Sequence, residues 1–275
     1  MSNLRRPRVT VVVPSRNCKD TIVKLLHSLR KLDYPNYEVL IVDSSTDGTD
    51  KICKEYRFKV ILFSSQVTVD TNIKRNIGIK NASGDIIAFT DGDCEVPSNW
   101  LSEIASTFAK FPNVDIVGGS VHTIPHSFAE YYADEALISI LPKYTYPVLI
   151  RKSSTGIRYP VCCNIAFRRS IFEQNKFNEN WGHGCDEIEL LCQLTNQGHL
   201  IYINPKIIVL RFDDGYQDQY DNVRPKLNVL NFKGSFGIIV NRVGSGNYMN
   251  WIEINNLDKE GHEIASHSYT HPDMN

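Results

Sequence analysis

The chain has 275 residues, of which 42% are hydrophobic and 22% are charged, and these proportions are typical of a globular protein with a buried core. Its length suits one large domain or two modest ones. The formal net charge of -1 argues against a general nucleic-acid binder, because the chain has no basic excess with which to neutralise phosphates. We therefore expect no nucleic-acid partner.

Two further features concern location in the cell. No apolar segment follows the arginines near the start of the chain, and no run approaches the roughly 18 apolar residues of a membrane span. The 7 cysteines are odd in number and include no CxxC pair, which favours free thiols in a reducing compartment. These features predict a cytoplasmic protein without a secretion signal.

The first part of the chain alternates between short apolar runs and amphipathic stretches. Residues 9–13 form a nearly continuous β-branched run, as expected for a strand buried on both faces of a parallel sheet. Apolar residues then recur at helical spacing, at Ile22, Leu25 and Leu29. A helix is also predicted at 72–80, and further strands at 38–42, 59–63 and 86–89. This alternation predicts an α/β sheet with parallel strands and right-handed crossovers.

Polar side chains follow three of the predicted strands. Asn17 comes after the first strand, Asp43 ends the second, and Asp91 and Asp93 follow the fourth. Ligands of such sheets collect beyond the carboxyl ends of the strands, so these side chains should face one crevice. Asp91-Gly92-Asp93 offers hard oxygen ligands for Mg²⁺ or Mn²⁺ beside a substrate's phosphates, although Asp and Gly are also ordinary turn residues. The convergence favours a nucleotide-type site.

Four segments resemble the family-2 glycosyltransferases of the GT-A fold, namely 11–17, 41–49, 75–78 and 84–93. The resemblance extends over roughly residues 8–210. It implies that Asp43 contacts the base of a nucleotide-diphospho-sugar and that Asp91 contacts its ribose. It also implies that Asp93 binds a Mn²⁺ or Mg²⁺ ion that bridges the diphosphate.

The same resemblance implies further contacts to the nucleotide-sugar. Pro14, Arg16 and Asn17 belong to the first matching segment and Arg75 to the third, and all four would line the donor site. One position departs from the family, which often has a second acidic residue after the equivalent of Asp43. This chain has a serine there.

Carboxylates cluster where a helix is predicted after residue 182. Sugar transfer needs a base that takes the proton of the acceptor hydroxyl, and a carboxylate on a rigid helix start can serve. The resembling family usually has Glu-Asp here, whereas this chain has Asp186-Glu187, and its pattern places Glu187 at the base position with Asp186 beside it. Acidic residues at a helix start also simply complement the helix dipole. Gln193 replaces a frequent arginine, which leaves the phosphate or acceptor contacts of this helix open.

The segment 211–275 carries a second candidate metal site. Asp213 and Asp214 end a predicted strand, and His267 and His271 follow four residues apart. Two histidines and one carboxylate are a sound ligand set for Zn²⁺ or a similar metal, and the second carboxylate can activate a bound water. Each pair alone is also compatible with a turn or a pair of surface histidines.

Together with 221–222 and 261–263, these residues resemble the first two motifs of NodB-homology polysaccharide deacetylases. The resemblance implies that Asp213 is the base and that Asp214 and the two histidines bind the metal. It also implies an incomplete (β/α) barrel, because the later motifs of that family are absent and so few strands cannot close a barrel. The segment is expected to belong to a longer bifunctional protein, to pack on the transferase domain, or to pair with another subunit.

The sequence thus predicts an α/β, Rossmann-like GT-A domain at 1–210 and a truncated deacetylase segment at 211–275. The first domain is expected to be an inverting glycosyltransferase that moves a sugar from a nucleotide-diphospho-sugar to a glycan or lipid-linked acceptor in cell-surface polysaccharide synthesis. Two alternatives stay open, namely a metal-dependent polysaccharide N-acetyl deacetylase and a non-catalytic sugar-nucleotide-binding scaffold. A lipid-linked acceptor would bring the protein to the inner face of the membrane.

Overall fold

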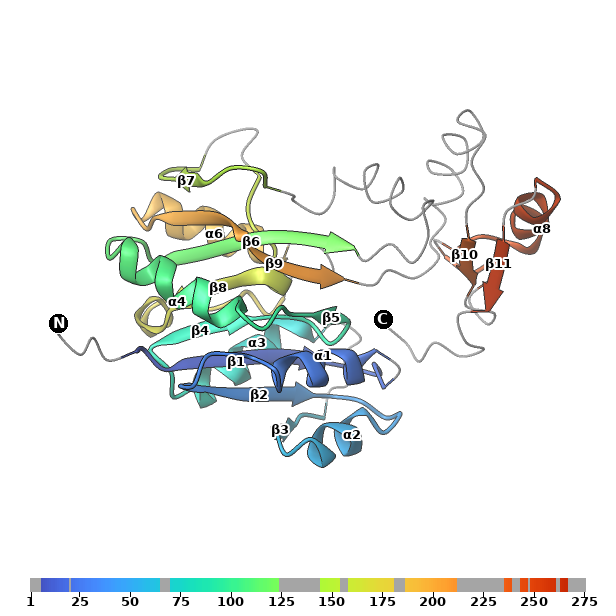
Figure 1. Cartoon of the computed structure of the whole chain (residues 1–275), viewed down its shortest axis with the longest axis horizontal. Coiled ribbons are helices and arrows are strands. Elements are labelled where there is room, and N and C mark those ends of the chain that lie inside the picture. Colours follow the sequence, from blue (N-terminus) through green and yellow to red (C-terminus); the bar gives the residue numbers. More distant parts are fainter. Residues whose placement is uncertain are drawn as a thin grey trace. The chain divides into compact units, whose positions relative to one another are not determined.

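A computed structural model of the chain contains two compact units (Figure 1). The residues that it describes are 6–19, 21–64, 70–123, 144–153, 158–180, 186–211, 235–238, 243–246, 248–260 and 263–266. The first unit holds the described residues up to 121 together with 144–209. Because strand β9 (Ile201–Arg211) continues past residue 210, the domain boundary expected there stays a prediction.

The described part of the first unit is built on a 9-stranded sheet of order β3-β2-β1-β4-β8-β6-β9-β5, with β7 paired to β9. The half that contains β3, β2, β1 and β4 is parallel, whereas β8 runs antiparallel to both β4 and β6. The strands other than β9 are β1 (Val9–Ser15), β2 (Tyr37–Asp43), β3 (Lys59–Leu62), β4 (Ile86–Phe89), β5 (Cys94–Glu95), β6 (Ile116–Thr123), β7 (Val148–Ile150) and β8 (Ile165–Arg168).

Helices cover both faces of this sheet. In Figure 1, α1 and α4 lie on the near face, and α3 and α6 lie behind the sheet. The helices and 3-10 turns of this unit are α1 (Ile22–Leu29), α2 (Thr49–Glu55), α3 (Thr71–Asn81), α4 (Trp100–Lys110), η1 (Cys162–Asn164), η2 (Arg169–Glu173) and α6 (Asp186–Asn196). Among the described residues, no helix combines the length and the apolar character needed to cross a bilayer.

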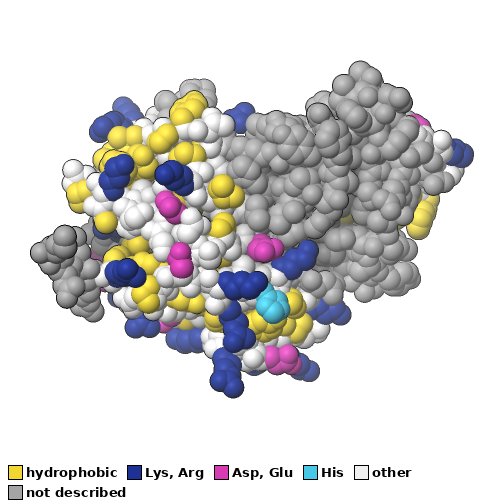
Figure 2. Space-filling model, viewed as in Figure 1, with side chains coloured by type: hydrophobic (Ala, Val, Ile, Leu, Met, Phe, Trp, Pro, Cys, Tyr) yellow, Lys and Arg dark blue, Asp and Glu magenta, His cyan; other side chains and the backbone are white. Residues whose placement is uncertain are grey.

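The amphipathic pattern of α1 explains its place on the sheet. Leu25, Leu26 and Leu29 are fully buried, whereas Lys24 and Arg30 are exposed. Figure 2 shows Lys and Arg side chains gathered over α1 and α2 on the near face of the molecule. The apolar stripe therefore packs inward and the charged stripe faces solvent.

Close packing of α3 against β1 depends on one glycine. A Cβ atom added at Gly78 would lie 2.3 Å from Cγ1 of Val12, so no larger residue fits without movement. On the same face, Val12 belongs to a core cluster that includes Phe89, Phe177 and Leu191. This cluster joins α3, α6 and the sheet into one core, which positions the strand ends described below.

The second unit contains a two-stranded parallel sheet of β10 (Ser235–Ile238) and β11 (Glu263–Ser266). Helix α8 (Trp251–Lys259) lies between them in the sequence and packs against β11. Ile254 and Leu257, on this helix, are buried. The arrangement is a β-α-β unit, in which parallel strands are joined by a helical crossover.

Candidate active site

The carboxyl ends of β1, β2 and β4 lie side by side at one edge of the sheet. The strands are in parallel register, with Ser15 opposite Asp43 and Val12 opposite Phe89. The residues that follow these strands, among them Asn17 and Asp91, are therefore brought to the same edge. This is the edge at which ligands bind in open parallel sheets.

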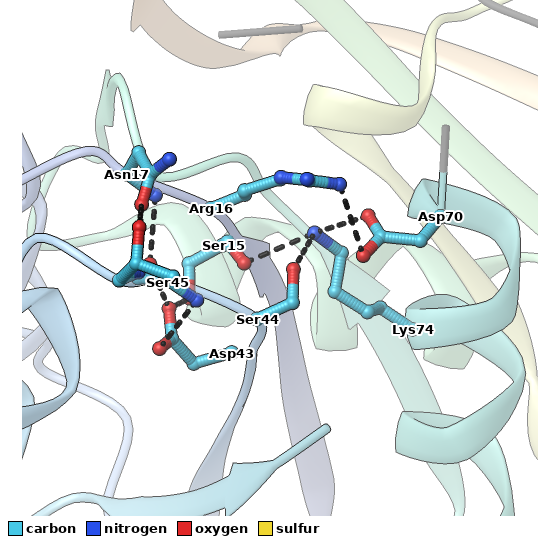
Figure 3. A network of polar contacts seen from close by, with 9 residues as sticks. Ser15, Arg16, Asn17, Asp43, Ser44, Ser45, Asp70 and Lys74 are labelled. Atoms are coloured by element: carbon cyan, nitrogen blue, oxygen red, sulfur yellow. Dashed lines mark hydrogen bonds and ion pairs between the residues drawn. The ribbon is translucent and has the colours of Figure 1, made fainter. Parts of the chain in front are cut away.

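Asp43 is held by three hydrogen bonds at this edge. Its Oδ1 accepts hydrogen bonds from the hydroxyls of Ser15 and Ser45, each 2.6 Å long, and its Oδ2 accepts the Ser45 N–H at 3.1 Å (Figure 3). The Asp43 side chain is only 1% exposed. The donors fix the direction of the carboxylate, and Oδ2 keeps a lone pair for a further donor.

Asn17 and Pro14 shape the end of β1 beside Asp43. Asn17 has φ of 49°, in the left-handed region that asparagine tolerates better than most residues. Its N–H donates to Ser45 Oγ at 2.7 Å, and its Oδ1 accepts the Thr46 N–H at 2.8 Å. Pro14 is buried opposite Val42 within the strand pair. Asn17 thus braces the loop after β2, and the contact of either residue with a nucleotide stays a prediction.

A buried charge cluster lies next to Asp43. Lys74 Nζ is 2.8 Å from Asp70 Oδ1 and donates to the Ser15 carbonyl at 3.0 Å and to Ser44 Oγ at 3.2 Å (Figure 3). The side chains of Lys74 and Asp70 are 3% and 2% exposed. Burial lowers the pKa of Lys74, and the hydrogen bond to Asp70 opposes that effect. Arg16 Nη1 lies 3.6 Å from Asp70 Oδ2, so one carboxylate pairs with two cations.

Sequence reasoning singled out Arg16 but missed Lys74 and Asp70. The only available signal was the spacing of an acidic and a basic residue four positions apart at a helix start, which is common on solvent-exposed helices. Burial of this pair is a tertiary feature and does not follow from the spacing.

Arg75 connects this edge of the sheet to the core. Its Nη2 lies 3.9 Å from Asp91 Oδ1, and its Nη1 donates to Asn72 Oδ1 at 3.0 Å. Its guanidinium carbon lies 5.5 Å from the centre of the Phe177 ring, within cation–π range. Arg75 is 4% exposed whereas the Asp91 side chain is 27% exposed. The buried cation is therefore fixed, and it presents its charge to a carboxylate that solvent or a ligand can reach.

Asp91 and Asp93 follow β4 on either side of a glycine. Asp93 is 8% exposed, and the Cys94 thiol donates weakly to its Oδ1 at 3.5 Å. A Cβ at Gly92 would lie 2.8 Å from Cys18 Sγ, so the turn needs a glycine for close packing. This contact gives the Asp-Gly-Asp turn a structural reason as well as a chemical one.

The two aspartates suit a Mg²⁺-type cation. Proteins bind such ions through one or two carboxylates, and substrate phosphates and water supply the other ligands. Asp91 and Asp93 provide that donor set, with oxygen atoms only. In the part of the chain that the structure describes, no three His, Cys, Asp or Glu side chains gather into a site that could hold a metal on its own.

Helix α6 begins at Asp186, as expected, and Glu187 in its first turn is 6% exposed. The side chain of Asp186 lies outside the described residues. Two residues on, Glu189 accepts hydrogen bonds from the Asn178 side chain at 2.9 and 3.2 Å. The Asn178 carbonyl in turn accepts a hydrogen bond from Asn72, the partner of Arg75. A continuous set of contacts thus links the helix of the expected base to the Asp91 edge.

The second candidate site is expected in the segment 211–275. Asp213, Asp214, His267 and His271 all lie outside the described residues. Their roles stay predictions.

A half-parallel sheet whose strand ends present a fixed carboxylate, buried cations and an acidic turn is the arrangement at which open α/β proteins bind their ligands. The chain belongs to glycosyl transferase family 2, whose family model matches residues 10–175. Residues 203–275 match the model of the polysaccharide deacetylase family. Both resemblances seen in the sequence are thereby confirmed.

Several curated proteins are similar to parts of this chain. Glycosyltransferase AglE of Haloferax volcanii is 30% identical over 177 residues, which cover 62% of this chain and 49% of AglE. The poly(ribitol-phosphate) beta-N-acetylglucosaminyltransferase TarS of Staphylococcus aureus is 35% identical over 105 residues, which cover 36% of this chain and 18% of TarS. The chain thus spans about half the length of AglE and a smaller share of TarS.

Solved structures agree with the architecture. The crystal structure of S. aureus TarS 1-349 has a TM-score of 0.60 and 21% identity, and the match covers 81% of this chain and 64% of that one. The mannosyltransferase PcManGT from Pyrobaculum calidifontis, in complex with GDP-Man and Mn²⁺, has a TM-score of 0.57 and 23% identity, and the match covers 79% and 61%. These likenesses confirm the expected GT-A fold.

Proposed function

We propose that the first unit transfers a sugar from a nucleotide-diphospho-sugar to a glycan or lipid-linked acceptor in the synthesis of a cell-surface polysaccharide. The observation that carries the proposal is that one edge of the sheet holds both the fixed carboxylate of Asp43 and the Arg75–Asp91 pair. TarS 1-349 has been crystallised with UDP and with UDP-GlcNAc, which supports a nucleotide-sugar donor for a chain of this fold.

In this proposal Asp43 accepts a hydrogen bond from the base of the donor. Its preset orientation removes the entropic cost of ordering it when the nucleotide binds. Pro14, Arg16 and Asn17 line the same side of the site, and Asp91 binds the ribose beside Arg75. The ribose reaches Asp91 because that carboxylate is the more exposed partner of the pair.

Asp93, with Asp91 nearby, would hold Mn²⁺ or Mg²⁺. The cation supplies positive charge beside the diphosphate leaving group. Structures of PcManGT and of GalNAc-T7 contain Mn²⁺, which supports a divalent cation in this fold.

Glu187, or Asp186 beside it, takes the proton from the acceptor hydroxyl. The acceptor oxygen then forms a bond to the anomeric carbon while the bond from that carbon to the diphosphate oxygen breaks. The nucleoside diphosphate leaves with the electron pair, and attack from the opposite face inverts the anomeric configuration. Burial of Glu187 keeps water away from the carboxylate that performs this step.

The test is nucleoside diphosphate release from UDP- and GDP-sugars with Mn²⁺ or Mg²⁺. We expect release that EDTA abolishes and that Asp93→Asn lowers by about 100-fold or more, because several kcal/mol of charge stabilisation are lost. Asp33→Asn, at an exposed aspartate on the surface, is the matched control and should be unaffected. Undiminished turnover of Asp93→Asn would remove the metal role. Donor binding without any release would favour the non-catalytic scaffold.

The base is assigned by comparing Glu187→Gln with Asp186→Asn. The variant that loses transfer while its affinity for the nucleoside diphosphate is unchanged identifies the base. Equal loss of nucleotide affinity in both would instead show that α6 serves donor binding.

A second candidate activity rests on the match of residues 203–275 to the polysaccharide deacetylase family. We propose that Asp214, His267 and His271 bind Zn²⁺ or a similar metal and that Asp213 activates a water for attack on an N-acetyl group. The test is acetate release from N-acetylated glycans, stopped by a chelator and restored by Zn²⁺. Unchanged acetate release by His267→Ala would refute the ligand set.

A further inference from the structure

We propose that Lys74 is a positioning residue for the donor nucleotide, a role that rests on the proposed glycosyltransferase function. Its ammonium group carries three N–H donors. The three have acceptors on Asp70, Ser15 and Ser44, at 2.8, 3.0 and 3.2 Å. Since each donor is matched by a protein acceptor, Lys74 acts on a ligand through the residues that it ties together.

The acceptors of Lys74 belong to three different segments of the site. Ser15 is the last residue of β1, and its hydroxyl donates to Asp43. Ser44 directly follows Asp43 at the end of β2, and its N–H also donates to the Ser15 carbonyl at 3.1 Å. Asp70 lies immediately before α3, the helix that carries Arg75. Lys74 therefore joins the strand ends beside Asp43, the proposed acceptor for the nucleotide base, to the helix that carries Arg75.

The energetics favour a geometric role over a stabilising one. Burial of an ammonium group is costly, and the lowered pKa of Lys74 reflects that cost. An apolar side chain of similar length often replaces a buried ion pair with no loss of stability. A methionine could therefore fill the space beside β1, but it could not hold Ser44, Ser15 and Asp70 in one arrangement.

The arrangement also extends to Arg16. Asp70 binds Lys74 through Oδ1 and lies 3.6 Å from Arg16 through Oδ2, so Lys74 and Arg16 share one buried counter-charge. Figure 3 shows the contacts of the Asp70 carboxylate with both cations. Without Lys74, the Asp70 carboxylate can turn toward Arg16. The Arg16 side chain would then leave its place beside the proposed site of the nucleotide-sugar.

The test measures the affinity of the full chain for UDP and GDP by calorimetry, beside its unfolding in urea. Lys74→Met leaves Asp70 buried with one partner fewer, so the double variant Lys74→Met/Asp70→Asn removes both charges. We expect the single variant to be less stable and the double variant to regain stability. Both should bind the nucleoside diphosphate about 10-fold more weakly, the equivalent of one hydrogen bond to a charged group. Lys80→Met, at an exposed lysine on the same helix, should bind as the wild type does.

Kinetics separate positioning from folding. KM for the donor should rise in the double variant while kcat at saturating donor stays within about 3-fold, because the reacting groups are untouched. Ser44→Ala, which removes a single acceptor of Lys74, should weaken binding in the same direction by a smaller factor. Wild-type affinity in the double variant would overturn this inference alone. A wild-type chain that binds no nucleoside diphosphate would overturn the proposed function, and this inference with it.

Discussion

Asn72 donates a hydrogen bond of 2.9 Å from its side-chain amide to the backbone carbonyl of Asn178, which lies 106 residues further along the chain. The other end of the same amide accepts a hydrogen bond from Arg75. Asn72 is 4% exposed, so both groups are protected from water. The residue therefore fixes α3 to the segment that precedes α6 and orients Arg75 at the same time.

Replacing Asn72 should reveal the strength of this link. Asn72→Leu leaves the Asn178 carbonyl and an Arg75 N–H without their partner, so we expect a loss of about 2 kcal/mol in the free energy of unfolding. Urea denaturation measures it. Asn81→Leu, at an exposed position of the same helix, should change stability by less than about 0.5 kcal/mol. Equal stability of the two variants would contradict this interpretation.

Gly78 allows α3 to approach β1, and alanine should not fit. A Cβ would lie 2.3 Å from Val12 Cγ1, so we expect Gly78→Ala to destabilise the fold by about 1–3 kcal/mol. Val12→Ala removes the obstructing methyl group, and the double variant should be more stable than the sum of the two single effects predicts. Lys80→Ala, at an exposed position of the same helix, is the control and should change stability little. Strict additivity of the Gly78 and Val12 effects would refute the steric explanation.

Asn164 ties three parts of the first unit together. Its Oδ1 accepts the Trp100 indole N–H at 3.0 Å, and its Nδ2 donates to the Ser120 and Ile207 carbonyls at 2.7 and 3.1 Å. Asn164→Asp puts a carboxylate oxygen against those two carbonyls in a fully buried place, so we expect a loss of about 3 kcal/mol or more. Thermal unfolding and the near-UV circular dichroism of the tryptophans, Trp100 among them, measure this loss of stability. Asn180→Asp, at an exposed position, should leave both unchanged.

Glu38 should contribute to the stability of the protein at neutral pH. Partial burial raises the pKa of its carboxyl group, but hydrogen bonds from Ser83 and Thr10 outweigh that effect and lower the pKa below its ordinary 4.5. The folded protein thus binds fewer protons here than the unfolded chain does, so the contribution is fully present above pH 4.5 and is lost as pH falls through the folded value.

Glu38→Gln should therefore flatten the acid side of the stability curve and cost about 1 kcal/mol at neutral pH. Unfolding in urea at several pH values measures both effects. Glu55→Gln, at an exposed glutamate, is the control. An unchanged acid slope in Glu38→Gln would contradict the assignment.

The buried thiols should react slowly. Burial raises the pKa of Cys53 to about 12, and a hydrogen bond with Cys163 together with burial raises that of Cys94. Only a trace of either is thiolate near pH 8, whereas Cys192 is partly exposed. Iodoacetamide should modify Cys192 at least about 10-fold faster than Cys53, and peptide mass spectrometry measures the two rates. Comparable rates in the native protein would contradict the burial of Cys53.

Local patterns in the sequence were sufficient for the strands of the parallel half and for their polar ends. The continuous β-branched run near the start of the chain predicts a strand that is buried on both faces. Strand β1 indeed extends from Val9 to Ser15 and is buried throughout. Parallel strands place their carboxyl ends at one edge, so the meeting of Asn17, Asp43 and Asp91 there followed from the pattern itself.

Tertiary structure alone decided which groups hold those residues in place. Lys74 meets the Ser15 carbonyl from 59 residues away and Ser44 from 30 residues away, and no local pattern encodes such contacts. The antiparallel insertion of β8 between β4 and β6 is likewise a matter of packing, because pairing between distant strands depends on the shared core. The periodicity of apolar residues shows which face of one helix or strand is buried. Burial of a charged pair depends instead on every element packed around it.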